Sequence, residues 1–215
     1  MFSIKREPEP SELKQTNKQF KSEIKELSIK KSYEHYKKNK TRLKYNTEET
    51  KKLFAKMNFL RCTFCDQVIH DFYDAMTVEH IELKSSNPDK IYEWTNLLCS
   101  CKTCNTKRST KKYNNNLYLD PTKITGIERY FKFEFDGQVK PNDNLNKNDI
   151  AKADYMIKLY KLNREQLIYD RRQFIFDLLN DEFYNCISEK NKDNKHIIFL
   201  SLFTYYKKEV KNSEE

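Results

Sequence analysis

The sequence predicts an α+β fold in three parts. Residues 47–121 combine short apolar strands with two Cys-x2-Cys pairs, a pattern typical of a small mixed core built around a metal. Residues 122–215 begin with one hairpin signal and continue with Ile, Leu, Phe and Tyr at helical spacing. Residues 1–46 read as an extended arm followed by a basic helical segment. We therefore expect a central metal-bound core, an N-terminal arm and helix that contact a partner, and a mainly α-helical C-terminal scaffold.

The composition indicates a folded chain with a basic surface. Hydrophobic residues make up 37% and charged residues 34% of the 215 residues, so a core can form. Lys and Arg number 41 against 32 Asp and Glu, which gives a net charge of +9 and favours a polyanionic partner such as nucleic acid. A solvated Lys-rich surface is the alternative, and charge alone does not separate the two.

The sequence predicts a cytoplasmic protein without a membrane partner. Residues 1–10 are charged and carry no apolar run like that of a signal peptide. No segment approaches the roughly 20 consecutive apolar residues that span a bilayer. In a reducing compartment, paired Cys-x2-Cys motifs favour a metal site over disulfides.

The N-terminal region is expected to be extended and then helical. Pro8 and Pro10 predict an extended arm over residues 1–10, laid on another surface. From Ser11, a candidate N-cap, the pattern becomes helical. Residues 14–44 hold eleven basic and three acidic residues with few apolar positions, so we expect an exposed, conditionally ordered segment. It could grip phosphates or a partner, or be a solvated helix.

The central region predicts a helix, a hairpin and a second helix. Thr47 caps a helix that runs to Met57, with acidic residues in its first turn. The expected elements after it are a cysteine knuckle, two strands, a loop with a helical turn and a helix, at residues 59–65, 67–70, 76–80, 86–94 and 101–112. The two strands would form a β-hairpin ahead of the helix.

The C-terminal region predicts one further hairpin and three helices. Alternating Phe and charged residues over 131–139 surround Asp136-Gly137, a hairpin signal. Amphipathic helices are expected over residues 147–162, 163–188 and 194–208. Their aromatic stripes favour core packing or subunit contact over base stacking.

Four cysteines predict a structural zinc site. Zinc prefers a tetrahedron of soft ligands, and two Cys-x2-Cys turns can present four thiolates to one ion. The predicted ligands are Cys62, Cys65, Cys101 and Cys104. The 35 residues between the pairs exceed a simple zinc ribbon, so this insertion must be an element with its own purpose. Cys99 and Cys186 lack such partners and are assigned to apolar packing.

Polar residues inside this insertion repeat a nuclease pattern. Glu79 and His80 end a predicted strand, Asn96 follows in the loop, and eight residues separate it from Asn105 beside the last cysteine. A lone His at a strand end or an Asn in a loop is usually structural. Together, between the two halves of a zinc site, they resemble the HNH, or ββα-metal, endonucleases in the form that ends in Asn.

Phosphodiester hydrolysis explains why these groups would be gathered. A water must lose a proton as it attacks phosphorus, and the growing negative charge needs neutralising. The resemblance implies that His80 is the general base and that Glu79 and Asn105 hold a catalytic Mg²⁺ or Mn²⁺, which prefer oxygen ligands. It also implies that Asn96 tethers the loop and orients His80. Lys107 and Arg108 would contact the phosphate backbone.

Further segments are similar to one branch of this family. They are Ile4-Lys5-Arg6 with Glu9-Pro10, Trp94 to Leu98, Leu119-Asp120-Pro121, Phe133 to Gly137 and Leu162-Asn163-Arg164. Together they resemble the HNH nuclease subunits of Septu anti-phage defence systems, which also occur as effectors of some retrons. The resemblance implies assembly with an ABC-type ATPase subunit. In the retron setting it also implies a reverse transcriptase with its RNA and DNA product.

The sequence departs from the family pattern at three places, one of which is the basic loop after Asn105, where small residues are expected. Glu79 stands where Asp is common, and Glu is one methylene longer, which shifts the expected metal position. The Pro-Lys that usually follows the catalytic His appears here as Leu83-Lys84, so Lys84 is the corresponding candidate for a phosphate contact.

Two rival functions remain open. One is a zinc-finger module that binds nucleic acid without cutting it, through the basic residues Lys107, Arg108, Lys111 and Lys112. The other is a structural adaptor whose metal site is inactive. Whether DNA or RNA is the target is not readable from the sequence.

Overall fold

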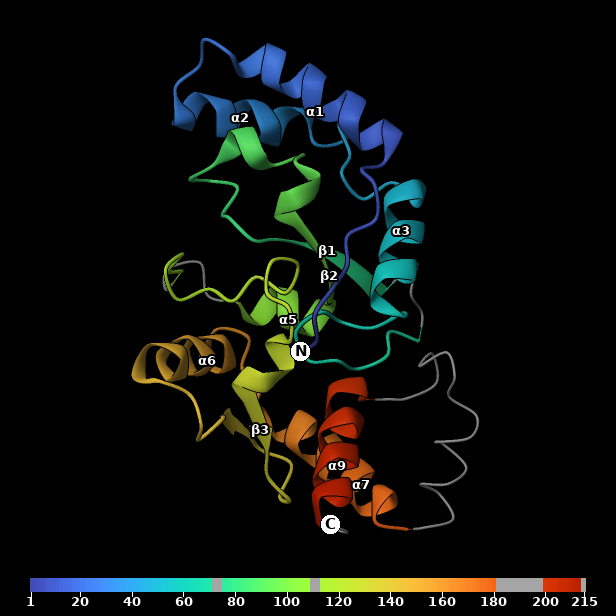
Figure 1. Cartoon of the computed structure of the whole chain (residues 1–215). Helices are drawn as coiled ribbons and strands as arrows, with labels where there is room; N and C mark the ends of the chain where they lie inside the picture. The colour runs from blue at the N-terminus through green and yellow to red at the C-terminus, as the bar shows by residue number, and fades with distance from the viewer. Residues whose placement is uncertain (71–74, 109–112, 181–198, 214–215) are drawn as a thin grey trace.

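Figure 1 shows the computed structural model, which describes residues 1–70, 75–108, 113–180 and 199–213. The N-terminal helices lie at one end and the C-terminal helices at the other, with the HNH-like core between them (Figure 1). The core contains the strands β1 (Met76–His80) and β2 (Leu97–Cys101) and the helix α5 (Lys102–Lys107). The mixed α+β class predicted from the sequence is confirmed.

The remaining elements surround this core. The N-terminal helices are α1 (Ser11–Ile24), α2 (Ile29–Asn39) and α3 (Glu48–Asn58). Short helical turns occupy η1 (Pro88–Lys90), η2 (Trp94–Asn96) and η4 (Ile127–Tyr130). The C-terminal part has β3 (Phe131–Phe133), β4 (Val139–Pro141), α6 (Lys147–Leu159), α7 (Glu165–Leu178) and α9 (Leu200–Ser213).

The core hairpin pairs β1 with β2, and the expectation that residues 67–70 pair with β1 was wrong. The strands are antiparallel, with Met76 opposite Cys101 and His80 opposite Leu97. In the expected strand only Val68 forms a bridge, to Arg61. Strand β2 is buried along nearly its whole length, and such strands read as plain apolar runs without the alternation that reveals a half-exposed strand. Residues 81–96 separate the two strands, and a connection of this length is longer than the short loop from which a hairpin is usually predicted.

The helix α5 is shorter than expected. It begins where the Cys101 sulfur accepts a hydrogen bond from the Cys104 backbone N–H, and it ends at Lys107. Arg108 has an extended backbone with ψ 125°. Residues 109–112, the rest of the expected helix, lie outside the described residues. The strands and this one helix nevertheless give the predicted β-β-α order, and α5 packs on both strands.

The N-terminal helices are packed elements, which corrects the prediction of an exposed, conditionally ordered segment. Leu13, Phe20, Ile24 and Tyr36 are buried, and the ring of Phe20 lies 4.9 Å from that of Tyr92. These few apolar residues fall on the inner faces of α1 and α2, so a low apolar content still produces one buried stripe per helix.

Glu49 caps the start of α1 in place of the Ser11 side chain. The Glu49 carboxylate accepts hydrogen bonds from the backbone N–H groups of Ser11 and Glu12, at 3.1 and 3.2 Å. A carboxylate at this end also interacts favourably with the helix dipole. The predicted cap at Thr47 is confirmed, because its hydroxyl accepts a hydrogen bond from the Thr50 backbone N–H at 3.3 Å.

The N-terminal arm is bound to the core of the same chain. The Arg6 guanidinium donates to the backbone carbonyls of Trp94, Thr95 and Leu97 at 2.7 to 3.0 Å. In return the Trp94 indole N–H donates to the Glu7 carbonyl at 2.8 Å. The arm therefore holds the segment that leads into β2. The arm was expected to lie on another surface, and that surface is the core of the same chain.

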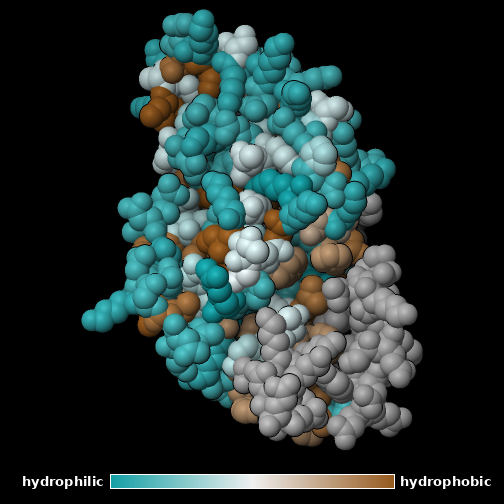
Figure 2. Space-filling model, in the orientation of Figure 1, coloured by the Kyte–Doolittle hydropathy of each residue, from teal (hydrophilic) through white to brown (hydrophobic). Residues whose placement is uncertain are grey.

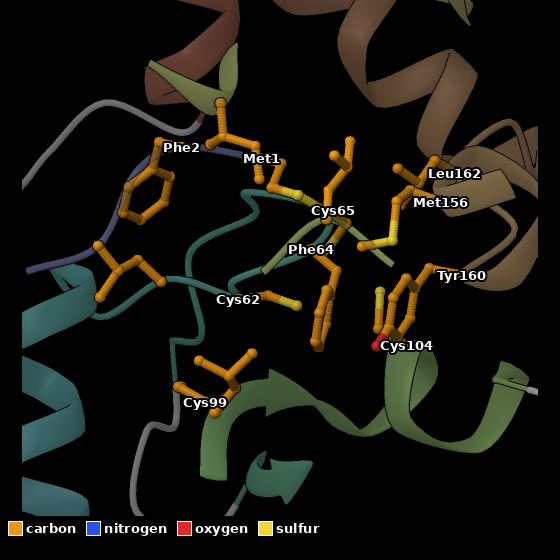
Figure 3. Packing of buried hydrophobic residues seen from close by; sticks show 14 of the residues in the cluster. Met1, Phe2, Cys62, Phe64, Cys65, Cys99, Cys104, Met156, Tyr160 and Leu162 are labelled. Carbon is orange, nitrogen blue, oxygen red and sulfur yellow. The ribbon is translucent and has the colours of Figure 1, made fainter. Parts of the chain in front are cut away.

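The C-terminal region packs on the cysteine knuckles. Figure 3 shows Phe64, which lies between the first two cysteines of the motif, beside Tyr160 at the end of α6. Their rings stack with centroids 3.7 Å apart. The hairpin around Asp136-Gly137 is confirmed, and so are helices near the predicted positions. Residues 181–198, including Cys186, lie outside the described residues.

The visible surface is mainly hydrophilic over the N-terminal helices (Figure 2). Leu27 and Ile29, at the junction of α1 and α2, are 37% and 60% exposed. Across the described part of the chain, every helix is too short or too polar to cross a bilayer.

Candidate active site and zinc centre

The four predicted zinc ligands lie together. The sulfurs of Cys62, Cys65, Cys101 and Cys104 are all within 4.8 Å of one another. Zn–S bonds of about 2.3 Å in a tetrahedron place sulfurs about 3.8 Å apart, and the sulfurs of Cys65 and Cys101 are separated by 3.9 Å. The donor set and its spacing therefore fit one zinc ion. Cys99 is fully buried outside this group, as predicted, and its sulfur donates to the Arg61 carbonyl.

Arginines from the C-terminal region approach the sulfurs. The Arg164 guanidinium lies 3.8 Å from the sulfur of Cys104, and Arg171 is only 2% exposed nearby. Burial lowers the pKa of Arg171 to about 10, although the thiolate charges oppose that shift. Four thiolates around Zn²⁺ carry a net charge of about −2, so these cations stabilise the bound state. No sequence spacing links Arg164 to cysteines sixty residues earlier, which is why sequence reasoning missed it.

One pocket of about 210 Å³ brings together most of the predicted catalytic residues. Glu79 and His80 come from the end of β1, Asn105 comes from α5, and Lys84 comes from the loop after β1. The pairing of β1 with β2 brings α5, which follows β2 directly, against the end of β1. Two tyrosines from the N-terminal region, Tyr33 and Tyr45, complete its wall.

His80 is buried and held in one orientation. Its Nε2 lies 2.9 Å from the Ile91 carbonyl, which can only accept, so Nε2 carries the proton and Nδ1 is the unprotonated nitrogen. The Tyr45 ring packs edge-on against the imidazole at 4.7 Å. Burial, together with the nearby Lys84 charge, lowers the pKa of His80 to about 3. The imidazole is therefore neutral at physiological pH.

Asn96 lies behind the pocket and ties its loop together. Its Oδ1 accepts from the Glu82 backbone N–H at 2.7 Å, and its Nδ2 donates to the Lys90 carbonyl at 2.9 Å. The Asn96 carbonyl also accepts from the Ile81 N–H at 2.9 Å. These bonds hold both ends of the loop that carries the Ile91 carbonyl, the partner of His80. The geometry matches the tethering position expected from the resemblance.

Glu79 and Asn105 offer oxygen donors to the same pocket. The Asn105 Nδ2 lies 3.5 Å from the Val78 carbonyl, which places the amide beside β1. A carboxylate and an amide oxygen are ligands that Mg²⁺ and Mn²⁺ accept, with water and substrate phosphate completing the shell. The four-cysteine cluster is the single group of three or more His, Cys, Asp or Glu donors in the described ranges. A hard cation here would depend on this pair and on substrate.

Arg108, the predicted phosphate contact, is buried at the wall of the pocket. It is 7% exposed, and its guanidinium pairs with the Glu79 carboxylate and donates to the carbonyls of His80 and Ile81. Its charged end also lies 4.9 Å from the Tyr113 ring centre. Sequence position placed Arg108 on a surface helix, but the helix ends before it and the side chain turns inward. Of Lys107 only the backbone is described.

Lys84 points its ammonium at two tyrosines. Its Nζ lies 3.3 Å from the Tyr45 hydroxyl and 3.5 Å from the Tyr36 hydroxyl, and 5.4 Å from the Tyr45 ring centre. Burial raises the pKa of Tyr36 to about 12, so the hydroxyl stays neutral beside the ammonium. Lys84 is half-buried and lines the pocket, where its charge is available to an anion.

Comparison with known proteins agrees with this geometry. Residues 62–111 match the HNH endonuclease family model. The matched segment contains the zinc cysteines, β1, β2, α5 and every predicted catalytic residue. The chain thus carries an HNH endonuclease domain between its N-terminal and C-terminal helices.

Part of the chain is also similar to a Septu protein. The chain is 32% identical over 75 residues to the Septu protein PtuB of Bacillus thuringiensis. The similar region covers 35% of this chain and 29% of that protein. The HNH domain and this likeness agree with the resemblance drawn from the sequence.

Proposed function

We propose that this chain is a metal-dependent HNH endonuclease that hydrolyses phosphodiester bonds as the effector of a Septu-type anti-phage defence system in the cytoplasm. The observation that carries the proposal is the single pocket lined by Glu79, His80, Asn105 and Lys84. The match of residues 62–111 to the HNH family supports the reaction class, and the likeness to a Septu protein supports the biological setting.

His80 acts as the general base in this proposal. Its Nδ1 is free because Nε2 is engaged by the Ile91 carbonyl, so it can receive the proton of an attacking water. Burial lowers the pKa of His80, and a base accepts a proton more readily as its pKa approaches the working pH. A phosphodiester anion entering the pocket would raise the pKa of the imidazole, whereas a divalent cation on Glu79 would lower it.

Glu79 and Asn105 would hold Mg²⁺ or Mn²⁺, which when bound neutralises charge on the scissile phosphate. Arg108 pairs with the same Glu79 carboxylate and would compete with the cation for it. Two cations near one carboxylate repel each other, so metal binding must weaken the Arg108 contact or use the other carboxylate oxygen. Lys84 lines the same pocket, and its ammonium would receive part of the phosphate charge.

Cleavage assays test the proposal against the non-cutting rival. Wild type, His80→Ala and the control His70→Ala are incubated with plasmid, single-stranded DNA and RNA in Mg²⁺ or Mn²⁺, and binding is measured by fluorescence anisotropy. His70 is exposed and outside the pocket. We expect cleavage by wild type and His70→Ala, and a loss of at least about 100-fold in His80→Ala with binding intact. Binding without cleavage in every condition, with the partner ATPase included, would support a nucleic-acid-binding module or adaptor.

The resemblance to Septu nuclease subunits also supports an ABC-type ATPase partner. A nuclease left unrestrained would damage its host, so we propose that the ATPase holds this chain inactive until infection. Co-expression with an ABC-type ATPase encoded beside this gene, followed by size-exclusion chromatography, tests assembly. A purified chain that is fully active and unaffected by the ATPase would contradict restraint. A neighbouring reverse-transcriptase gene would place the system among the retrons.

A further inference from the structure

Two tyrosines from the N-terminal region form part of the wall of the active-site pocket. Tyr33 lies on α2 and Tyr45 follows that helix, more than thirty residues before the HNH motif. Both are half-buried and both line the pocket together with Lys84. Resting on the proposed nuclease function, we propose that Tyr33, Tyr45 and Lys84 form a nucleotide-binding subsite that takes an unpaired base next to the scissile phosphate.

Neighbouring contacts hold the two rings in place. Tyr33 stacks on Tyr36 with ring centroids 5.9 Å apart and planes 24° apart. Tyr45 meets the imidazole of His80 at 85°, edge to face. A fixed ring loses little conformational entropy when a base stacks on it, so preorganised aromatic walls favour binding. The subsite is thus built before substrate arrives.

The chemistry of this wall fits a nucleotide. Base-aromatic stacking contributes about 1–3 kcal/mol per base and tolerates any base sequence. The Lys84 ammonium lies beside the Tyr45 ring and hydroxyl, so an anionic phosphate can be held while its base contacts the rings. Lys37, whose ammonium lies over the Tyr33 ring at 5.2 Å from its centre, is a second cation next to the subsite. Aromatic rings with cations are the usual components of sites for single strands.

The depth of the site favours an unpaired strand over a duplex. Glu79 and His80 are each only 5% exposed, so the scissile phosphate must enter the pocket to reach them. In a duplex both faces of a base are covered by its neighbours, and exposing one costs a few kcal/mol of unstacking and unpairing. An unpaired strand can turn one base onto the tyrosine wall without that cost. The same contacts suit DNA and RNA.

Binding measurements on the full chain test the subsite. In a His80→Ala background, which prevents cleavage, we compare Tyr33→Leu and Tyr33→Phe by anisotropy with labelled 12-nucleotide single-stranded DNA, RNA and a matched DNA duplex. Tyr33 is chosen because Tyr45 touches His80 itself. We expect Tyr33→Leu to weaken single-strand binding by about 5- to 150-fold, the equivalent of about 1–3 kcal/mol, and to leave duplex binding unchanged. Tyr33→Phe keeps the ring and should bind within about 2-fold of its parent.

Matched controls separate this proposal from a folding defect and from the nuclease proposal. Tyr169→Leu replaces a tyrosine that is 50% exposed on α7, outside the pocket, and should change nothing. Thermal unfolding of each variant must match that of its parent. Unchanged single-strand binding in a folded Tyr33→Leu, or an equal loss on duplex, would overturn the subsite while leaving cleavage by wild type intact. Cleavage that is absent in wild type would instead refute the nuclease.

Discussion

Replacing Asn96 by Ala should destabilise the protein and disable its active site together. Asn96 is 4% exposed and makes two short side-chain hydrogen bonds, one from the Glu82 N–H and one to the Lys90 carbonyl. Each such bond contributes about 0.5–1.5 kcal/mol, and each partner left unsatisfied costs about 1–3 kcal/mol. Because water can reach part of this loop, we expect a total loss of about 2–4 kcal/mol.

The consequence for His80 follows from the loop that Asn96 holds. The Ile91 carbonyl, which orients the imidazole, is the next residue after the Lys90 carbonyl that Asn96 binds. Once this loop relaxes, Nε2 loses its fixed partner and Nδ1 no longer points consistently at the attacking water. A misplacement of about 1 Å can cost about 100-fold in rate, so we expect a fall of that order in kcat.

Urea and thermal unfolding, paired with a cleavage assay, measure both effects. For a chain of this size, 2–4 kcal/mol corresponds to a fall in Tm of about 5–15 °C. Thr95→Ala is the matched control, because Thr95 is the neighbouring residue and its side chain is exposed. The reasoning is refuted if Asn96→Ala unfolds with the same Tm as Thr95→Ala, or if it is destabilised as expected and still cleaves at the wild-type rate.

Three further predictions concern the buried charges and the metal. Arg108→Met leaves the Glu79 carboxylate unpaired in the interior, so it should lower the free energy of unfolding in urea by about 3–5 kcal/mol. Added Mn²⁺ should stabilise this variant more than it stabilises wild type. Equal stability of variant and wild type would contradict this prediction. Because the pKa of His80 is lower in the folded than in the unfolded chain, the unfolded chain takes up a proton at a higher pH than the folded chain as the pH falls. The free energy of unfolding is therefore highest above pH 6.5 and falls as the pH drops, by about 2 kcal/mol at pH 5 relative to His80→Gln. Parallel pH profiles of the two proteins would count against the burial of the imidazole. Cys62→Ser should lose zinc and no longer unfold cooperatively, whereas the control Cys99→Ala should keep one zinc per chain, as measured by elemental analysis. Zinc retained by Cys62→Ser would show that another set of ligands binds it.

The local features were predictable because their physics is local. The cap at Thr47, the strand that ends in Glu79 and His80, and the turn at Gly137 depend on neighbours a few residues away. Gly137 has φ 88°, a backbone conformation that glycine adopts readily. The metal ligands were also readable, since Cys-x2-Cys is a turn that presents two sulfurs on one side.

The pairing partner of β1 and the interior position of Arg108 were not predictable in this way. Leu97–Cys101 is an apolar run too short to distinguish a strand from another buried segment. Arg108 looks like a surface residue in the sequence, and only the end of α5 and the nearby carboxylate bring it inside. The same holds for the basic N-terminal helices, whose few apolar residues find a core only in the fold.

The sequence by itself identified the four cysteines that cluster, the Glu79-His80 pair and the HNH family that they resemble, because residue types and motif spacing are written in the order of residues. Only the tertiary structure decided which loop orients His80, which cation neutralises Glu79, and that Tyr33 and Tyr45 wall the pocket. These contacts join residues far apart in the chain. Their energies come from burial and from hydrogen bonds across the core, which no periodicity of the sequence records.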